Sequence, residues 1–139
     1  MTAGEVVAST RVALGGDAAF RVFTDDIDRW WRRDPARPDA VVQFQGDRLI
    51  SVSADGAELV AEVARWRPPT LVELRWLGPH AKDGDVVVLE FAPDRSGTRV
   101  TVRHRQIGMA SGRAGTGGAG LWWADLLRRF SAAHPSSTS

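Results

Sequence analysis

The sequence contains no cysteine. Disulfide bonds, thiolate metal sites, iron–sulfur clusters and a cysteine nucleophile are therefore excluded, and the composition fits a reducing cytoplasm. Long hydrophobic runs are also missing, because Ser9, Thr10 and Arg11 interrupt the first apolar stretch at 6–14 and no run approaches the length of a signal sequence or a membrane span. We expect a cytoplasmic protein that does not insert into a membrane.

Neither sign of charge is in large excess, since 18 Lys and Arg residues face 17 Asp and Glu residues and give a net charge of +1. Arg29, Arg32 and Arg33 form a local basic cluster beside Trp30 and Trp31. Tracking a phosphate backbone needs a broader basic surface than this cluster provides. We therefore expect no nucleic acid as a partner.

The remaining composition is that of a folded protein. Of the 139 residues, 43% are hydrophobic and 25% are charged, which is typical of a globular chain that can bury one core. No period of tens of residues recurs, so a repeat architecture is not expected. We predict a single domain over 1–134 and a disordered tail over 135–139.

Alternating apolar and polar residues predict seven strands, and turn residues separate six of them along the chain. The predicted strands are 5–14, 41–45, 48–53, 58–66, 71–77, 85–92 and 98–106. Two short helices are expected after the first strand, one capped by Asp17 and the next by Thr24 or Asp25. An amphipathic helix is expected at 119–133. We expect connecting loops at 34–39, which holds two prolines, and at 108–120, which is rich in glycine.

The order of these elements predicts an α+β architecture. Strands that follow one another without intervening helices pair antiparallel, and the apolar stripe of the last helix must be buried against the apolar face of the sheet. Twist would curl the sheet around that helix, the short helices would close one end, and an apolar pocket lined by tryptophan would remain. Alternation assigns these residues to the inner face: Val72, Leu74, Trp76, Val87, Leu89, Phe91, Val100, Val102 and His104. Strand 58–66 is ambiguous, because both of its faces carry apolar and charged residues.

Several short segments are specific when they occur in this order: AFRVFTD at 19–25 with IDRWW at 27–31, RPPTLVELRW at 67–76, LEFAP at 89–93 with GTRV at 97–100, VRH at 102–104 and GLWW at 120–123. In this combination the chain resembles the helix-grip domains of the START-like superfamily, and within it the bacterial homologues of the activator of Hsp90 ATPase. The resemblance covers about 5–133. It implies a sheet that grips the last helix and a cavity between them. It limits function only broadly, because the superfamily includes lipid carriers, hormone receptors and cyclase-type enzymes.

Our leading hypothesis is that a small hydrophobic, aromatic or lipid-like molecule binds between the sheet and the last helix. Apolar contact would supply the affinity, and His104 at the pocket rim, Arg65 or Glu62 would orient the ligand through hydrogen bonds. The loop at 108–120 would open and close the mouth. Candidate ligand-binding residues are Trp30, Trp31, Phe44, Trp76, Leu89, Phe91, Val102, His104, Trp123 and Leu127. The alternative for each of these aromatic residues is that it simply fills the core.

Two other functions stay open at this point. One is a polyketide cyclase-like or dehydratase-like enzyme in the same pocket, with Glu62 and His104 as an acid/base pair. The other is a protein-interaction module that regulates a chaperone or another partner through the outer face of the sheet. We expect a monomer or a homodimer.

Several kinds of site are not expected. His80 and His134 lie in a loop and in the tail, so the three histidines form no convincing metal site. The segment 115–120 satisfies G-x-G-x-x-G, but this fingerprint binds a nucleotide only within a parallel βαβ unit. The chain has no G-x-S-x-G motif, and spacing alone identifies no catalytic residue. We predict neither a cofactor nor a metal.

Overall fold

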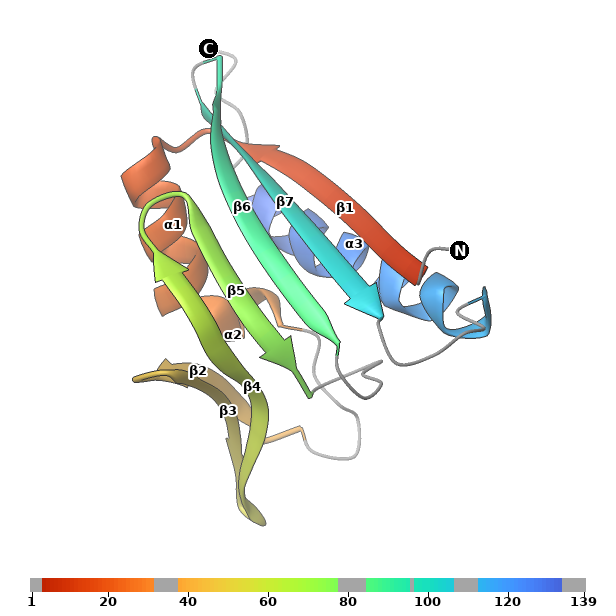
Figure 1. Cartoon of the computed structure of the whole chain (residues 1–139). Helices are drawn as coiled ribbons and strands as arrows, with labels where there is room; N and C mark the ends of the chain where they lie inside the picture. Colours follow the sequence, from red (N-terminus) through yellow and green to blue (C-terminus); the bar gives the residue numbers. More distant parts are fainter. Residues whose placement is uncertain (1–3, 32–37, 78–84, 96, 107–112, 134–139) are drawn as a thin grey trace.

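The computed structural model describes residues 4–31, 38–77, 85–95, 97–106 and 113–133, with the backbone alone at 4, 106 and 113–120. Its elements are β1 (Gly4–Val12), α1 (Gly16–Asp25), α2 (Ile27–Trp30), β2 (Val41–Gln45), β3 (Arg48–Ser53), β4 (Gly56–Arg67), β5 (Leu71–Trp76), β6 (Val86–Asp94), β7 (Gly97–Gln106) and α3 (Arg113–Ala133). The strands form one antiparallel sheet in the order β1-β7-β6-β5-β4-β3-β2. The sheet curves, and all three helices lie on its concave side (Figure 1). The predicted α+β architecture is confirmed.

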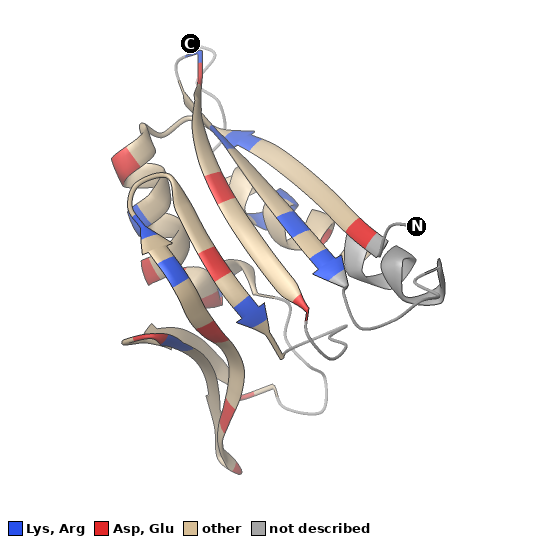
Figure 2. Ribbon diagram, in the orientation of Figure 1, with Lys and Arg blue, Asp and Glu red and all other residues tan. Residues whose placement is uncertain are grey.

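The two faces of the central strands are divided as alternation predicted. The residues assigned to the inner face of β5, β6 and β7 are all buried, and each is at most 4% exposed. Charged residues alternate with them along these strands (Figure 2), and a strand directs successive side chains to opposite faces. Several of these form ion pairs across neighbouring strands, such as Arg103 with Glu90, whose Nε and Oε1 atoms are 3.0 Å apart.

Strand β4 contains two β-bulges, which explain why its alternation could not be read. Leu49 and Ile50 of β3 pair with Ala61 and Leu59, which leaves Val60 as an extra residue on β4. A second shift leaves Ala64 as an extra residue between the pairs that β4 makes with β5. Each extra residue reverses which face the following side chains occupy.

Helix α3 is longer at its start than the sequence indicated, because it begins at Arg113 and not at 119. The prediction of a loop is therefore wrong for 113–120, while 107–112 lies outside the described residues. Each glycine lowers helix propensity by about 1 kcal/mol relative to alanine. Adding turns to an existing helix is nevertheless much easier than nucleating one, so an amphipathic C-terminal half can carry such a segment. The G-x-G-x-x-G segment consequently lies within a helix and not at a strand-to-helix turn.

Helix α3 packs mainly against β1 and also against α2. Its buried residues are Trp122, Trp123, Leu126, Leu127 and Phe130, as the helical spacing predicted. Helix α1 packs against β6 and β2. The two short helices meet α3 near its C-terminus, where Phe130 contacts Phe23 and Trp30.

The predicted helix caps are wrong. Gly15 is the N-cap of α1 and Asp26 is the N-cap of α2, and neither makes a side-chain capping bond. Asp17 lies instead in the first turn of α1, where its negative charge is favourable near the positive end of the helix dipole. The hydroxyl of Thr24 donates a hydrogen bond to the carbonyl of Phe20 within α1.

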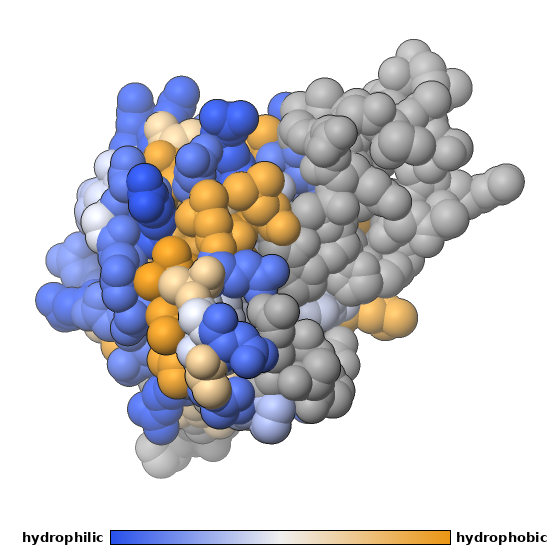
Figure 3. Space-filling model, turned by 90° about the horizontal axis from the view of Figure 1, so that it is seen from below, coloured by the Kyte–Doolittle hydropathy of each residue, from blue (hydrophilic) through white to orange (hydrophobic). Residues whose placement is uncertain are grey.

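Some large apolar side chains remain exposed on the described surface. They are Val7, Val41, Val52, Trp66, Leu77 and Leu121. Viewed from the end of the sheet where β5 and β7 finish, hydrophobic side chains gather at the surface beside the residues that the structure does not describe (Figure 3). Leu77 directly follows β5 and is 54% exposed.

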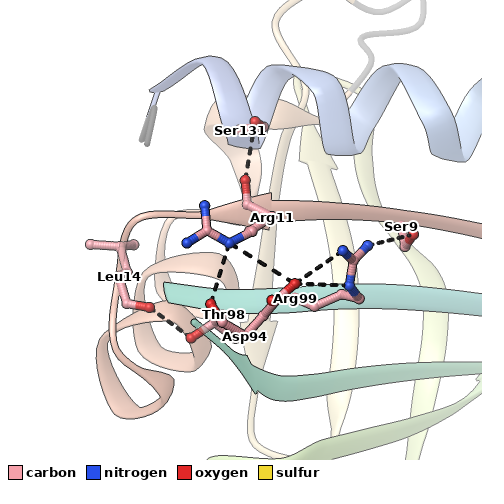
Figure 4. A network of polar contacts seen from close by, with 7 residues as sticks. All are labelled: Ser9, Arg11, Leu14, Asp94, Thr98, Arg99 and Ser131. Atoms are coloured by element: carbon pink, nitrogen blue, oxygen red, sulfur yellow. Dashed lines mark hydrogen bonds and ion pairs between the residues drawn. The ribbon is translucent and has the colours of Figure 1, made fainter. Parts of the chain in front are cut away.

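The opposite end of β7 is joined to β1 and α3 by a network of polar contacts (Figure 4). Arg99 and Arg11 both approach the Oδ2 atom of Asp94, at 3.0 and 3.9 Å. The hydroxyl of Thr98 donates a hydrogen bond of 2.6 Å to the carbonyl of Leu14, and that of Ser131 donates one of 3.4 Å to the carbonyl of Arg11. This network fixes the turn between β6 and β7 against the end of β1.

Gly97 begins β7 in this crowded region, and we expect Gly97→Ala to lower the free energy of unfolding by about 1–3 kcal/mol. A Cβ atom at Gly97 would lie 2.1 Å from the carbonyl oxygen of Val12, so the backbone of one of the two strands would have to move. Urea unfolding followed by circular dichroism measures the change. The matched control is Gly16→Ala, where nothing lies within 4 Å of the new Cβ. This helical position should gain about 0.4–1 kcal/mol, and equal effects at both glycines would contradict the argument.

Candidate functional site

His104 is the centre of a hydrogen-bonded group inside the protein. It lies on the inner face of β7, opposite Val6 of β1 and Val87 of β6, and its side chain is completely buried. Its Nε2 atom is 2.8 Å from Oδ2 of Asp85, and the indole Nε1–H of Trp123 donates a 3.0 Å hydrogen bond to its Nδ1 atom. His104 was expected at the rim of a pocket, and the structure places it in the interior instead.

The partners of His104 determine its tautomer. An indole N–H can only donate, so the Nδ1 atom of His104 must accept and carries no hydrogen. The hydrogen of the neutral imidazole is therefore on Nε2, which donates it to the Asp85 carboxylate. The result is a chain of two hydrogen bonds that runs from α3 through β7 to the residue preceding β6.

Four indoles in mutual contact adjoin this polar chain, and we refer to Trp31, Trp76, Trp122 and Trp123 as the indole cluster. The ring centroids of Trp76 and Trp123 are 5.0 Å apart, and those of Trp122 lie 4.8 Å from both Trp123 and Trp31. The Trp76 ring also lies 6.1 Å from the imidazole of His104. All four indoles are buried, with at most 7% of each exposed. The cluster therefore lies between the sheet and α3, where β5 and β7 end and β6 begins (Figure 1).

The structure separates the ten candidate ligand-binding residues into groups. Four of them belong to this site: Trp31, Trp76, His104 and Trp123. Leu89 and Val102 face one another on neighbouring strands of the buried sheet face, one inner-face position away from His104. Trp30, Phe91 and Leu127 are buried in the hydrophobic core, where Trp30 contacts Phe130. Phe44 is only partly buried and contacts Trp66, with 5.6 Å between the ring centroids.

Glu62 and Arg65 do not take part in this site. Glu62 pairs with Arg75 and Arg65 pairs with Glu73, and all four side chains are at least 32% exposed. The bulge at Ala64 places both residues of β4 on the outer face of the sheet. Because His104 lies on the inner face, the hypothesis of a Glu62–His104 acid/base pair is wrong. The role given to Glu62 or Arg65 in orienting a ligand on the inner side is wrong for the same reason.

Asp85 is the functional candidate that sequence reasoning missed, although a signal was present. It precedes Val87, Leu89 and Phe91 at alternate positions, so the pattern placed its carboxylate on the inner face. Trp122 was also missing from the candidate residues, although it lies in the segment predicted as an amphipathic helix. Its ring lies 6.1 Å from that of Trp76, which brings α3 and β5 together there.

The part of the chain that the structure describes contains no candidate metal site. No three His, Asp or Glu residues lie close enough together there to act as ligands. His80 and His134 lie outside the described residues, so the absence of a metal stays a prediction. Among the described helices, none combines the length and the apolar character of a membrane span.

Comparisons with known proteins agree with this fold. One similar solved structure is CalU16 from Micromonospora echinospora, with 16% identity over 94% of this chain and 75% of that chain and a TM-score of 0.67. Another is Ms6760 from Mycobacterium smegmatis, with 16% identity over 93% of this chain and 89% of that chain and a TM-score of 0.64. A third is the Aha1 dimer from Colwellia psychrerythraea, with 13% identity over 97% of this chain and 99% of that chain and a TM-score of 0.63. At these identities they show the fold alone.

A search among curated proteins finds no match. The family model described as Activator of Hsp90 ATPase homolog 1-like protein matches residues 17–134. That match spans most of the sequence and agrees with the resemblance seen in its motifs. The chain therefore belongs to the family of Activator of Hsp90 ATPase homolog 1-like proteins.

Proposed function

We propose that this protein binds a small aromatic or apolar molecule at the indole cluster, with the His104–Asp85 pair as the polar anchor of the site. The observation that carries the proposal is the placement of this pair, which is completely buried and whose imidazole adjoins the indoles of Trp76 and Trp123. Ligand sites of this kind combine an apolar lining with a few polar groups that fix orientation.

Stability alone does not account for the pair. Removing a carboxylate and an imidazole from water is costly, and apolar residues of similar size would often hold a core together equally well. A buried polar pair within an aromatic cluster therefore supports a role in recognition. A flat apolar molecule would suit this region, since its rings could replace some of the edge-to-face contacts that the indoles make with one another.

Access to the site is expected from the end of the sheet where β5 and β7 finish. Trp76 is the last residue of β5, and Asp85 directly precedes β6 at this same end. Hydrophobic side chains also reach the surface at this end (Figure 3). Opening and closing of the mouth stays a prediction, because 107–112 belongs to the segments that are not described.

Titration with the apolar fluorophore 1-N-phenylnaphthylamine tests the proposal. We expect its emission to rise and saturate, and Trp31→Leu to weaken binding about fivefold, because one indole wall of the site is lost. Trp66→Leu is the matched control, since Trp66 is not part of the cluster and its removal should leave the affinity unchanged. An emission that does not saturate, or an equal loss in both variants, would refute the proposal.

The same polar pair favours catalysis as a second candidate, of the cyclase or dehydratase type. A carboxylate that accepts Nε2–H orients an imidazole and leaves Nδ1 as its basic nitrogen. In this structure, however, Nδ1 already accepts the hydrogen bond of Trp123. The indole would have to move before His104 could take a proton from a substrate, so the geometry supports binding better than proton transfer.

The chaperone-partner hypothesis receives less support from the described residues. The family description refers to an activator of Hsp90 ATPase. The outer face of the sheet, which would be the contact surface, carries cross-strand ion pairs such as Arg105 with Glu5 and Arg103 with Glu90. Large exposed apolar patches mark most protein-binding faces, and these paired charges are a poor match to that description.

A further inference from the structure

A hollow lies at the surface away from the indole cluster. It is an open groove of about 440 Å³ between α1 and the turn that joins β4 to β5. Its lining residues are Asp17, Phe20, Arg21, Thr24, Asp25, Trp66, Pro68 and Pro69. The turn precedes β5, whereas Trp76 of the indole cluster ends the same strand. The two sites are therefore separated by the length of β5.

Trp66 is the aromatic wall of this groove. It is 43% exposed, whereas the other five tryptophans are buried. Its position is nevertheless fixed, because its ring packs against the rings of Phe20 at 5.2 Å and Phe44 at 5.6 Å. An indole that is held in place and still exposed to a hollow is preorganised to contact a ligand, and little side-chain entropy is lost on binding.

The helix side of the groove carries an excess of negative charge. Asp17, Arg21 and Asp25 are four residues apart along α1, so they lie on one face of the helix. All three are exposed, and within the described residues none of them takes part in an ion pair. Two carboxylates and one guanidinium therefore give the lining a net charge of −1 and leave both carboxylates available to a ligand.

We propose that this groove binds an organic cation, a small molecule in which an ammonium group is attached to an apolar body. The face of an indole attracts cations, and most strongly among the aromatic side chains. The ammonium group would lie between Trp66 and the carboxylates of Asp17 and Asp25, and the apolar body would contact the proline pair. The indole cluster offers no such charge arrangement, so this site would take a ligand of a different class.

The probe for this proposal is 2-phenylethylammonium, and its neutral counterpart is 2-phenylethanol, which has the same apolar body. Binding is followed by the indole N–H signals in two-dimensional NMR, and the signal of Trp66 is identified by its loss in Trp66→Leu. We expect the cation to shift the Trp66 signal and to bind about fivefold more tightly than the alcohol. The signals of Trp122 and Trp123 should not move.

Two double variants separate the local charge from the net charge of the protein. Asp17→Asn with Asp25→Asn should abolish the preference for the cation. Asp47→Asn with Asp55→Asn removes the same charge from exposed hairpin turns outside the groove and should leave the preference unchanged. Equal affinities for cation and alcohol in the parent protein would overturn the proposal, as would an unmoved Trp66 signal.

The same NMR titration tests whether the bound cation is a small molecule or a side chain of a partner protein. Tighter binding of N-acetyl-arginine amide than of 2-phenylethylammonium would contradict a small-molecule ligand and indicate a basic side chain of a partner protein. Binding of 1-N-phenylnaphthylamine at the indole cluster is measured by the emission of the dye and tested with Trp31→Leu, so it does not depend on the Trp66 signal. Failure of one proposal is therefore distinguishable from failure of the other.

Discussion

His104→Leu should lower the free energy of unfolding by about 3–5 kcal/mol, because removing the imidazole takes a hydrogen-bond donor away from a buried carboxylate. The Asp85 carboxylate would lose the imidazole that donates to it at 2.8 Å. The indole N–H of Trp123 would lose its acceptor at the same time. Chemical unfolding at neutral pH, followed by far-ultraviolet circular dichroism, measures this loss.

Removing both members of the pair gives the informative comparison. We expect the double variant His104→Leu with Asp85→Leu to be more stable than His104→Leu alone, because no carboxylate then remains buried. The double variant should still be about 1–3 kcal/mol less stable than the parent protein, because the N–H of Trp123 then has no acceptor. Binding of 1-N-phenylnaphthylamine should also change, since the anchor is gone while the indoles remain. A double variant no more stable than the single one would show that the pair is not the coupled unit inferred from the structure.

Phe130→Ala should also lower the free energy of unfolding by about 3–5 kcal/mol, as is usual when a fully buried phenylalanine is truncated. The ring of Phe130 lies 5.0 Å from that of Phe23 and 4.8 Å from that of Trp30. It therefore joins α3 to both short helices, and no solvent reaches it. A cavity at this point would loosen three elements at once.

Leu121→Ala on the same helix is the control for that experiment. Leu121 is 74% exposed, so its truncation should change stability by no more than about 0.5 kcal/mol. Both variants keep the charge of the protein, and urea titration of the three proteins gives the comparison. A loss below about 1 kcal/mol for Phe130→Ala would contradict the role that we assign to its ring.

The inner face of the sheet was predictable because alternation is a strictly local signal. Val87, Leu89 and Phe91 occupy every second position of their strand, and all three are buried as predicted. The same pattern assigned His104 to the inner face, but its complete burial differs from the pocket rim that was expected. Its hydrogen-bond partners were not predictable, because Asp85 and Trp123 are each 19 residues away in the sequence. Only the pairing of β6 with β7 and the packing of α3 bring them together.

Strand β4 shows where alternation fails for a physical reason. Its bulges at Val60 and Ala64 shift the register against β3 and β5, and a shift by one residue reverses the faces. Glu62 and Arg65 are an odd number of residues apart and yet both lie outside. Nothing local in the sequence marks these bulges, so the proposed acid/base pair could not have been rejected before the sheet was known.

The pairing of the first strand with the last has a consequence for how the chain folds. Val12 pairs with Thr98, 86 residues later, and Gly4 pairs with Gln106. Contacts between such distant parts of a chain slow folding, because a large loop must close before they form. On the ribosome, β1 would remain without its strand partner until β7 had been synthesised, and α3 would follow only after that. The grip on the helix is thus assembled after the sheet that forms it.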